Sequence, residues 1–196
     1  MTTNELPLTK NAILDAAETV LRRYGPDKTS VVDIAKALQV SHGTLYRHFA
    51  SKTALREAVT ERWLQSSISI PLAKIAEQTE GSAAAQLRLW IETLIRAKWK
   101  FALEDAEMFG MYAAVTVSAV EIIAVHVEQL IAQLAFIIER GMASGEFKPG
   151  QPLALAKAVF VATSRFHHPS HAYEWTGEAV EAEFESVWQL LLLGLV

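Results

Sequence analysis

Apolar residues recur at helical spacing from one end of the 196-residue chain to the other. In the first segment, Ile13, Ala17, Val20 and Tyr24 fall at the i, i+4, i+7 and i+11 positions of one helix face. We find no stretch with the alternating pattern of a strand and no internal repeat. This periodicity predicts an all-α protein.

Three short helices are predicted near the N-terminus. Thr9, Ser30 and Ser41 can cap their first turns, because each offers a side-chain oxygen to unpaired backbone N–H groups. The dipeptide Gly-Pro at 25–26 ends the first helix. The second and third helices, at 31–38 and 42–49, are separated by a turn at 39–41 and so have the dimensions of a helix-turn-helix.

A longer helical region follows. A fourth helix is predicted to start after Ser51 and to pass through Trp63. Pro71 is expected to kink or break it, since proline lacks a backbone donor and crowds the preceding turn, and we place a hinge there. Further helices are predicted near 83–103, 119–142, 153–167 and 178–194, with Gly141 and Gly145 stopping the second of these and a loop at 148–152.

Composition restricts where the chain can work. There is no cysteine for disulfides or thiolate metal sites, which suits a reducing compartment. The first 14 residues lack the basic and apolar regions of a signal peptide, and no apolar run approaches the roughly 20 residues of a membrane span. We therefore expect a soluble cytoplasmic protein with no membrane partner.

Charge is divided unevenly along the chain. The net charge is −4, from 18 Lys plus Arg and 22 Asp plus Glu. Residues 1–64 hold 9 basic and 7 acidic residues, a net of +2, whereas residues 65–196 hold 9 and 15, a net of −6. Since screening at ordinary salt acts over about 8 to 10 Å, acidity in the second part does not prevent the first part from binding phosphates.

The stretch VSHGTLYRHF, residues 40–49, forms the third predicted helix, and Arg47 is its only certain positive charge. Ser41, Thr44 and Tyr46 are uncharged donors suited to phosphates or bases, and Gly43 permits close backbone approach. An ordinary helical hairpin would have the same spacing, but a helix used only for packing does not need these groups. The composition therefore favours a DNA-binding helix.

The run TSVVDIAKALQVSHGTLYRHFASKTAL, residues 29–55, closely resembles the DNA-binding signature of TetR-family transcriptional regulators. The resemblance implies about nine helices, with a helix-turn-helix head at 1–56 and a ligand-binding and dimerisation body at 57–196. It also implies a homodimer, mostly repressive in this family, that binds a pseudo-palindromic operator and is released by a small, largely apolar effector.

The resemblance assigns roles around the third helix. His42 is expected to read sequence together with Thr44 and Arg47, Gly43 to lie against the DNA, and His48 to be structural. The predicted DNA-binding residues are Thr29, Ser30, Ser41, His42, Gly43, Thr44, Tyr46, Arg47 and Lys52. One departure is Gln39, which stands where the family commonly has glycine; a non-glycine residue at positive φ costs on the order of 1 kcal/mol, so the turn either relaxes or carries strain.

The body is predicted to hold an effector in an apolar cavity with a few polar groups. Tyr112, His126 and Arg165 are the polar candidates, with Arg165 able to meet an anionic group. The predicted ligand-binding residues are Trp90, Trp99, Phe109, Tyr112, His126, Arg165 and Phe166, drawn from a larger set that includes Phe101, Met111 and Phe160. Each of these can instead serve only as core.

The last two long helices carry apolar stripes that can pair across a dimer. The stripes are Leu155, Val159, Ala162 and Phe166 on the first helix, and Phe184, Val187, Trp188 and Leu191 on the second. The alternative is that they only complete the core of one protomer. The resemblance favours the homodimer, because family members use their last two long helices this way.

A histidine-rich segment, RFHHPSHAYEW at 165–175, supports a competing hypothesis. His167 and His171 have the i, i+4 spacing of a zinc pair, with His168 and Glu174 nearby, as a metal-dependent hydrolytic enzyme would need. Pro169 between them disfavours a helix, so we expect no metal, no cofactor and no catalytic residue. A third possibility is a DNA-binding dimer that responds to no ligand.

Overall fold

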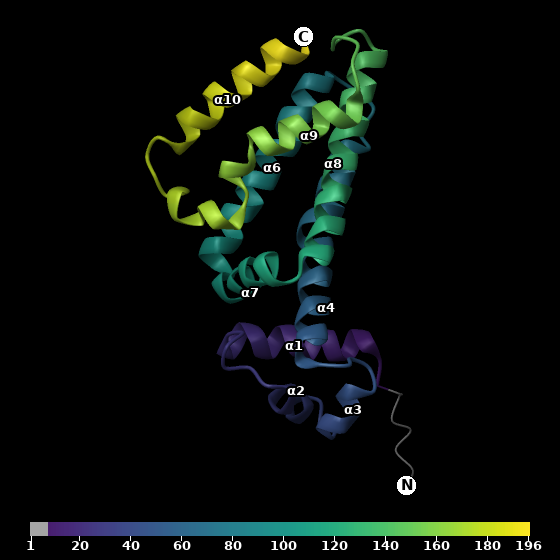
Figure 1. Cartoon of the computed structure of the whole chain (residues 1–196), viewed down its shortest axis with the longest axis vertical. Helices are drawn as coiled ribbons and strands as arrows, with labels where there is room; N and C mark the ends of the chain where they lie inside the picture. Colours follow the sequence, from purple (N-terminus) through teal and green to yellow (C-terminus); the bar gives the residue numbers. More distant parts are fainter. Residues whose placement is uncertain (1–7) are drawn as a thin grey trace.

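The computed structural model describes residues 8–196, and over that range it contains helices and no strand. Figure 1 shows a small head at one end and a longer body at the other, joined by α4. The helices are α1 Lys10–Tyr24, α2 Val31–Ala37, α3 His42–Tyr46, α4 Lys52–Leu64, α5 Ile70–Ala76, α6 Ala83–Glu104, α7 Ala106–Ser118, α8 Val120–Ala143, α9 Pro152–Ala162 and α10 Val180–Leu195. The predicted all-α class is confirmed. Residues 1–7, half of the segment on which the absence of a signal peptide was predicted, lie outside the described range.

The pattern of the sequence did not reveal α7. Only Asp105 separates it from α6, and only Ala119 separates it from α8. Its buried residues Met108, Met111, Tyr112 and Val115 have the i, i+3, i+4, i+7 spacing of one face, and the helix packs against α1, α4, α6 and α8. Apolar and small residues fill most of its other positions as well, so no polar face sets this stripe off in the sequence.

Pro71 does not break the helix that contains it. Residues 52–76 are continuously helical, with a π-helical segment, Gln65–Ser69, directly before α5. There the N–H of Ile70 donates to the carbonyl of Gln65, in the i to i+5 pattern. The wider π-turn accommodates the pyrrolidine ring, so the expected break was wrong, whereas the expected hinge stays a prediction.

The head is fastened to the body through α1 and α4. The Arg62 guanidinium of α4 binds Asp15 at 2.7 Å and Glu18 at 2.5 Å, both on α1. One turn further along the same face of α1, Arg22 pairs at 3.1 Å with Asp105, the residue that precedes α7. The predicted boundary at 56/57 falls inside α4, which packs in both parts, and remains a prediction.

Helix α8 is the central helix of the body. With 24 residues and a mean hydropathy of 1.6 over its most apolar window, it is long and apolar enough to cross a membrane by length and composition, contrary to the sequence expectation. It packs against α6 and α9, however, and contributes Leu130, Leu134 and Ile137 to the core. These contacts make it a core helix of the body.

The glycines at the end of α8 have different roles. Gly141 was predicted to stop the helix, but α8 continues to Ala143. A Cβ at Gly141 would lie 2.2 Å from the ring of Phe147, so this glycine is needed for close packing. Gly145, at φ +76, follows the helix and takes the left-handed conformation that ends it.

Candidate DNA-binding surface and effector site

The turn between α2 and α3 keeps a strained conformation. Ser30 caps α2 in a reciprocal capping box with Asp33, and the two bonds of Ser30 to its carboxylate lower the Asp33 pKa. At the other end of α2, Gln39 has φ 57, in the left-handed region. The N–H of Val40 then donates to the carbonyl of Ala35 at 3.0 Å, which closes the turn. The turn therefore carries the strain that Gln39 imposes and does not relax.

Helix α3 turns two residues inward and presents the others to solvent. Leu45 and Phe49 are 1% and 9% exposed, which confirms their predicted core positions. Ser41 caps the helix, and its hydroxyl lies 2.9 Å from that of Thr44, which also accepts from Arg47 at 3.3 Å. Ser41, His42, Gly43, Tyr46, Arg47 and Lys52 are exposed, and Thr44 and His48 are half-buried. Six of the nine predicted DNA-binding residues are thus exposed on α3, on the residues that flank it, or at the start of α4.

Gly43 has no internal reason to be glycine. A Cβ built there would meet only the Ser41 hydroxyl, at 3.8 Å, and its φ is not in the left-handed region. By contrast, Gly25 has φ +79, and a Cβ there would approach Glu107 at 2.6 Å. The lack of a side chain at Gly43 therefore matters only to whatever approaches α3 from outside.

Thr29 differs from the other predicted contacts, because it is 3% exposed. Its hydroxyl donates to the carbonyl of Gly25 at 2.8 Å and braces the loop between α1 and α2. A buried hydroxyl that is already bonded cannot reach a phosphate, so the structure gives Thr29 a packing position. Ser30 lies half-buried beside it, and its hydroxyl donates to the carboxylate of Asp33 at 2.6 Å.

A second group of polar residues lies buried in the body, where α4, α6, α7 and α8 meet. Lys98 of α6 is 2% exposed, and its Nζ lies 3.9 Å from the centroid of the Tyr112 ring of α7. The Tyr112 ring in turn lies 5.9 Å from that of Trp63, on α4. His126 of α8 is 7% exposed, and its Nδ1 is 3.1 Å from the hydroxyl of Ser69 in the π-turn. We call Trp63, Lys98, Tyr112 and His126 the buried polar cluster.

Burial dominates the electrostatics of this cluster. It lowers the pKa of Lys98 to about 7, because the ammonium has lost its hydration. The pKa of His126 falls to about 3, chiefly through burial and then through the nearby Lys98 charge. Burial also raises the pKa of Tyr112 well above its usual value. His126 and the 4%-exposed His167, which also feels the Lys98 charge, are therefore neutral at pH 7.

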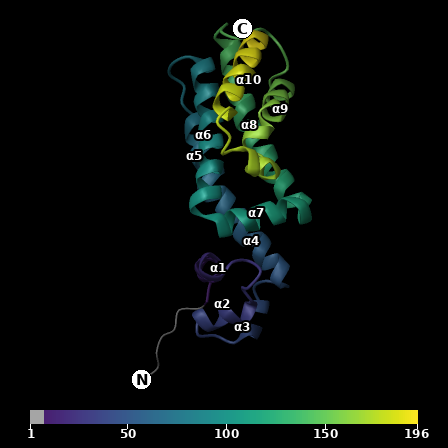
Figure 2. The ribbon, with the colours of Figure 1, turned by 90° about the vertical axis from the view of Figure 1, so that its left-hand side faces the viewer.

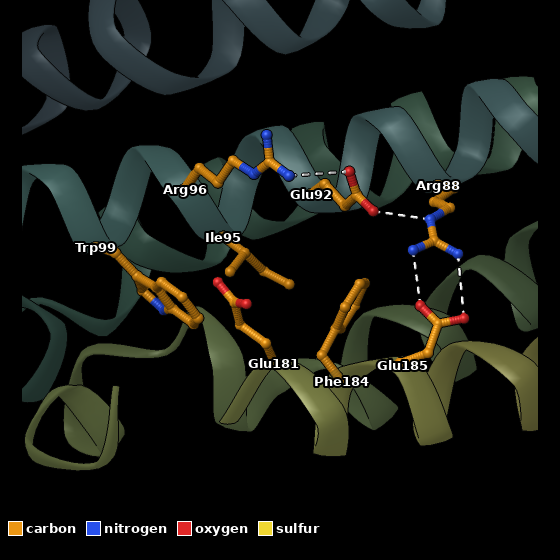
Figure 3. A pocket seen from close by; sticks show the side chains of 8 residues that line it. All are labelled: Arg88, Glu92, Ile95, Arg96, Trp99, Glu181, Phe184 and Glu185. Carbon is orange, nitrogen blue, oxygen red and sulfur yellow. Dashed lines mark hydrogen bonds and ion pairs between the residues drawn. The ribbon is translucent and has the colours of Figure 1, made fainter. Parts of the chain in front are cut away.

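A larger but more open groove lies between α6 and α10, with a volume of about 530 Å³. Figure 3 shows that four of its charged residues, Arg88, Glu92, Arg96 and Glu185, already pair with one another. Arg88 binds Glu185 of α10 at 2.7 Å and Glu92 at 2.7 Å. These partners raise the pKa of Arg88 and lower that of Glu185. Because most of its charged residues already have partners and are exposed to solvent, the groove offers an effector fewer free hydrogen-bonding groups than the buried polar cluster does.

Comparison with known families covers most of the chain. Residues 13–59 match the family described as "Bacterial regulatory proteins, tetR family". Residues 83–188, more than half of the chain, match the family described as "Tetracyclin repressor-like, C-terminal domain". The chain belongs to the TetR family.

Two curated relatives illustrate how the similarity of this TetR-family chain is distributed. An uncharacterized HTH-type transcriptional regulator of Mycobacterium tuberculosis is 37% identical over 89 residues, which are 45% of this chain and 43% of the relative. An HTH-type transcriptional repressor of the same species is 44% identical over 50 residues, 26% of this chain and 27% of the relative. The aligned segments thus span less than half of the length of these relatives.

Solved structures of low identity share the whole fold. SmeT, the repressor of the Stenotrophomonas maltophilia multidrug efflux pump SmeDEF, aligns with a TM-score of 0.64 at 16% identity over 97% of this chain and 91% of SmeT. FadR of Bacillus subtilis in complex with stearoyl-CoA aligns with a TM-score of 0.62 at 22% identity, over 94% and 98% of the two chains. These comparisons extend the TetR-like fold to the complete body.

The predicted ligand-binding residues of this TetR-family protein do not form one site. Tyr112 and His126 belong to the buried polar cluster, whereas Trp99 lines the groove between α6 and α10. Trp90, Phe109 and Phe166 are buried in the core. Arg165 lies at the surface and pairs with Glu174 at 2.6 Å and Glu183 at 3.0 Å, which raises its pKa.

Lys98 was absent from the predicted set, although the sequence holds a signal for it. The apolar stripe of α6 includes Leu87, Ile91, Leu94 and Ile95, and Lys98 follows at the next position of the same stripe. A lysine in register with an apolar stripe indicates a buried charge. Trp63 and Ser69 offered no comparable signal, because their roles depend on tertiary packing.

The histidine-rich segment does not form the arrangement that the metal hypothesis requires. It folds as two short 3₁₀ helices, Ser164–Phe166 and Pro169–Glu174, so His167 and His171 do not share a face of one α-helix. His167 points into the core and lies 3.3 Å from the Thr163 hydroxyl, while His171 bonds Glu174 at 2.7 Å. Within residues 8–196 no three His, Asp or Glu side chains come together in a way that could hold a metal ion.

Proposed function

We propose that this TetR-family protein is a homodimeric transcriptional repressor that binds a pseudo-palindromic operator through α3 and releases it when a small effector occupies the body. The observation that carries the DNA-binding part is the exposed surface of α3, whose glycine at position 43 serves no internal packing purpose. SmeT is a repressor by its description, and FadR was solved with stearoyl-CoA. We propose that the chain acts in the cytoplasm, where its operator would lie.

Contacts to the DNA backbone are assigned to groups on α3, at its N-cap and at the start of α4. Ser41, Thr44, Tyr46 and Lys52 are proposed to bind phosphates, because they are donors that lie in or at the edge of solvent. Gly43 would allow the helix backbone to approach the DNA. Ser30 stands at the margin of this surface, and Thr29 supports it from below.

Sequence reading is assigned to His42 and Arg47, with Thr44 beside them. Both are exposed, and His42 stacks edge-on against Tyr46 with ring centroids 6.4 Å apart. A histidine at the start of a recognition helix can reach base edges in the major groove. Tyr46 would then fix the orientation of the imidazole as well as bind a phosphate.

Dimerisation is proposed through α9 and α10, which lie at the end of the body far from the head (Figures 1 and 2). Four of the eight predicted stripe residues, Val159, Phe166, Phe184 and Trp188, are buried within the protomer and complete its own core. The other four are half-buried or exposed: Leu155, Ala162, Val187 and Leu191. Other apolar residues of these two helices are exposed and are proposed to form the interface: Leu153, Val161, Leu190 and Leu193. The proposed interface therefore uses the same two helices, but extends from the predicted stripes to their exposed apolar neighbours.

The effector response is proposed to act through α4. An effector must bind the DNA-free conformation better than the DNA-bound one, or it shifts nothing. Trp63 places α4 in the buried polar cluster, and the adjacent Arg62 holds α1 of the head. Movement of α4 on effector binding would change the separation of the two heads.

Selection of binding sites from random DNA tests the proposal. We expect a palindromic site whose binding falls by about tenfold or more in Tyr46→Phe, since each half-site loses a hydrogen bond to a charged phosphate. Tyr173→Phe, at a tyrosine 80% exposed in the body, serves as the matched control and should bind like wild type. Recovery of no preferred sequence by the wild-type protein would refute the proposal.

His42→Ala sharpens the assignment of sequence reading. It should change which bases are preferred at one position of each half-site, by about 1 to 3 kcal/mol of discrimination, while phosphate-driven binding stays. A variant that retains the wild-type preference would remove His42 from the reading role.

A further inference from the structure

The buried polar cluster carries hydrogen-bond donors that have no acceptor. Among residues 8–196, the buried atoms Trp63 Nε1, Lys98 Nζ and His126 Nε2 lack any hydrogen-bonding partner. When the Ser69 hydroxyl donates to Nδ1 of His126, the imidazole proton lies on Nε2, which makes Nε2 a donor as well. Three donors from three different helices thus share one region of the core.

Among the four residues of the cluster, Lys98 alone carries charge near neutral pH, and that charge is positive. The face of the Tyr112 ring lies 3.9 Å from Lys98 and partly offsets its desolvation. The Lys98 charge in turn adds to burial in lowering the pKa values of His126 and His167, and to a lesser extent that of His168. A buried ammonium without a carboxylate is costly, and proteins normally pair such a group or remove it.

From this arrangement we infer that the effector carries a carboxylate, and that its two oxygens bind Lys98 Nζ together with the indole N–H of Trp63 or the imidazole of His126, while its apolar part lies among the core side chains. The inference rests on the proposed function, because it names the chemical class of the effector. A carboxylate supplies acceptors and the opposite charge, the two properties that the cluster lacks. An apolar ligand without an acceptor would leave the donors unsatisfied.

The geometry also couples such a ligand to α4. The crevice that reaches His126, between α4 and α8, has a volume of about 30 Å³, which is room for about one water. It is lined by Glu61, Leu64 and Gln65 from the α4 side and by Ile122, Val125 and Gln129 from α8. A ligand with a carboxylate and an apolar chain fits only if α4 and α8 separate. Binding therefore favours a conformation with a displaced α4, which is the differential affinity that release of DNA requires.

Direct binding of matched ligand pairs tests the inference. The probes are decanoate, dodecanoate and 4-phenylbutyrate, each compared with its primary amide, which keeps the shape but removes the charge. Calorimetric titration of the wild-type dimer without DNA should show at least one carboxylate binding about tenfold or more tightly than its amide. In Lys98→Met that carboxylate should bind about 30-fold more weakly, the loss expected for a charge-assisted hydrogen bond, with little change for the amide.

The control is Lys100→Met, which removes an exposed lysine two residues away on the same helix and should bind the carboxylate like wild type. Trp63→Phe, which removes only the indole nitrogen and the fused ring, should weaken binding by a few fold. The inference is overturned if no carboxylate of the set binds, if the amides bind as tightly as the acids, or if Lys98→Met retains the acid affinity. Should Lys98→Met fail to fold, the acid and amide comparison on the wild-type protein decides alone.

These results can be separated from those for the proposed function. Operator selection is carried out without any ligand. Failure to bind an operator would therefore refute the proposed DNA-binding function, and it would leave the inference of a carboxylate effector untouched. If the operator is bound and is released by a ligand with no carboxylate, the regulator stands and this inference fails.

Discussion

The head and the body treat polar side chains in opposite ways. On α3 the polar groups lie at the surface and bond one another, as Ser41, Thr44 and Arg47 do. In the body, Lys98 and His126 are buried, and each has an atom without a partner among the described residues. A polar group at a surface costs little while it waits for DNA, whereas one in a core lowers stability until a partner arrives. The difference indicates that the head can bind DNA without first losing stability, whereas the unpaired polar groups of the body lower its stability while no ligand is bound.

The largest predicted effect tests whether the body carries this cost. The Lys98 pKa is lowered to about 7 in the folded protein, while in the unfolded chain it returns to its ordinary value near 10.5. Between these values the unfolded state binds more protons, so stability rises with pH across that window and the full penalty applies below it. We expect the wild-type protein to gain about 3 kcal/mol over Lys98→Met between pH 7 and 9.5.

Urea unfolding of both proteins at the two pH values measures this gain. Lys100→Met is the reference for removing a lysine that is exposed, and its stability should follow the wild type across the range. If the free energy of unfolding changed with pH equally in the wild type and in Lys98→Met, the Lys98 ammonium would not be buried as described. The contrast between head and body would then disappear.

The next effect concerns the head. Gly43→Ala places a methyl group in open space, so the free protein should be stabilised by about 0.5 kcal/mol through higher helix propensity. The same methyl group would meet DNA in both half-sites, and operator affinity should fall by about 2 kcal/mol in total, the usual scale of steric overpacking. Thermal melts and operator titration give the two values. An alanine variant that binds normally would mean that α3 does not approach DNA at this point.

A smaller effect tests the junction between the two regions. Arg62→Met removes the ion pairs to Asp15 and Glu18, and the half-buried position of Glu18 makes them worth about 1 to 2 kcal/mol. The matched control is Arg96→Met, because Arg96 is 78% exposed and its pair with Glu92 is long, at 3.6 Å. Arg96→Met should lower the free energy of unfolding by no more than about 0.5 kcal/mol. Equal losses in the two variants, measured by urea unfolding, would contradict the proposed role of Arg62 in holding the head.

The smallest effect lies in the turn of the head. Gln39→Gly relieves the left-handed strain, about 1 to 2 kcal/mol, but adds freedom to the unfolded chain that opposes about half of it. A net stabilisation of about 0.5 to 1 kcal/mol is expected in thermal unfolding. Gln39→Ala keeps the strain and should not be more stable than wild type. A glycine variant that is less stable would indicate that the Gln39 side chain contributes contacts of its own.

The two regions also differ in how much of them can be predicted from sequence. The helix-turn-helix is contiguous, so caps such as Ser41 and core residues such as Leu45 follow from local patterns, and the structure confirms both. The buried polar cluster takes Trp63, Lys98 and His126 from helices far apart in the chain, and only tertiary packing brings them together. Arg165 was predicted to meet an anionic group of the effector, but in the fold Glu174 and Glu183 pair with it.

The π-turn before Pro71 has a geometric consequence for the whole molecule. Each residue of an α-helix advances the direction of the chain by about 100° around the helix axis. A π-turn takes one more residue into its turn than an α-turn does, so restoring α-helical geometry over Gln65–Ser69 with all five residues kept would rotate the head by about that angle relative to the body. The recognition helices of two joined protomers would then face different sides of the double helix. The π-helical geometry of this five-residue segment thus sets the azimuth of the head.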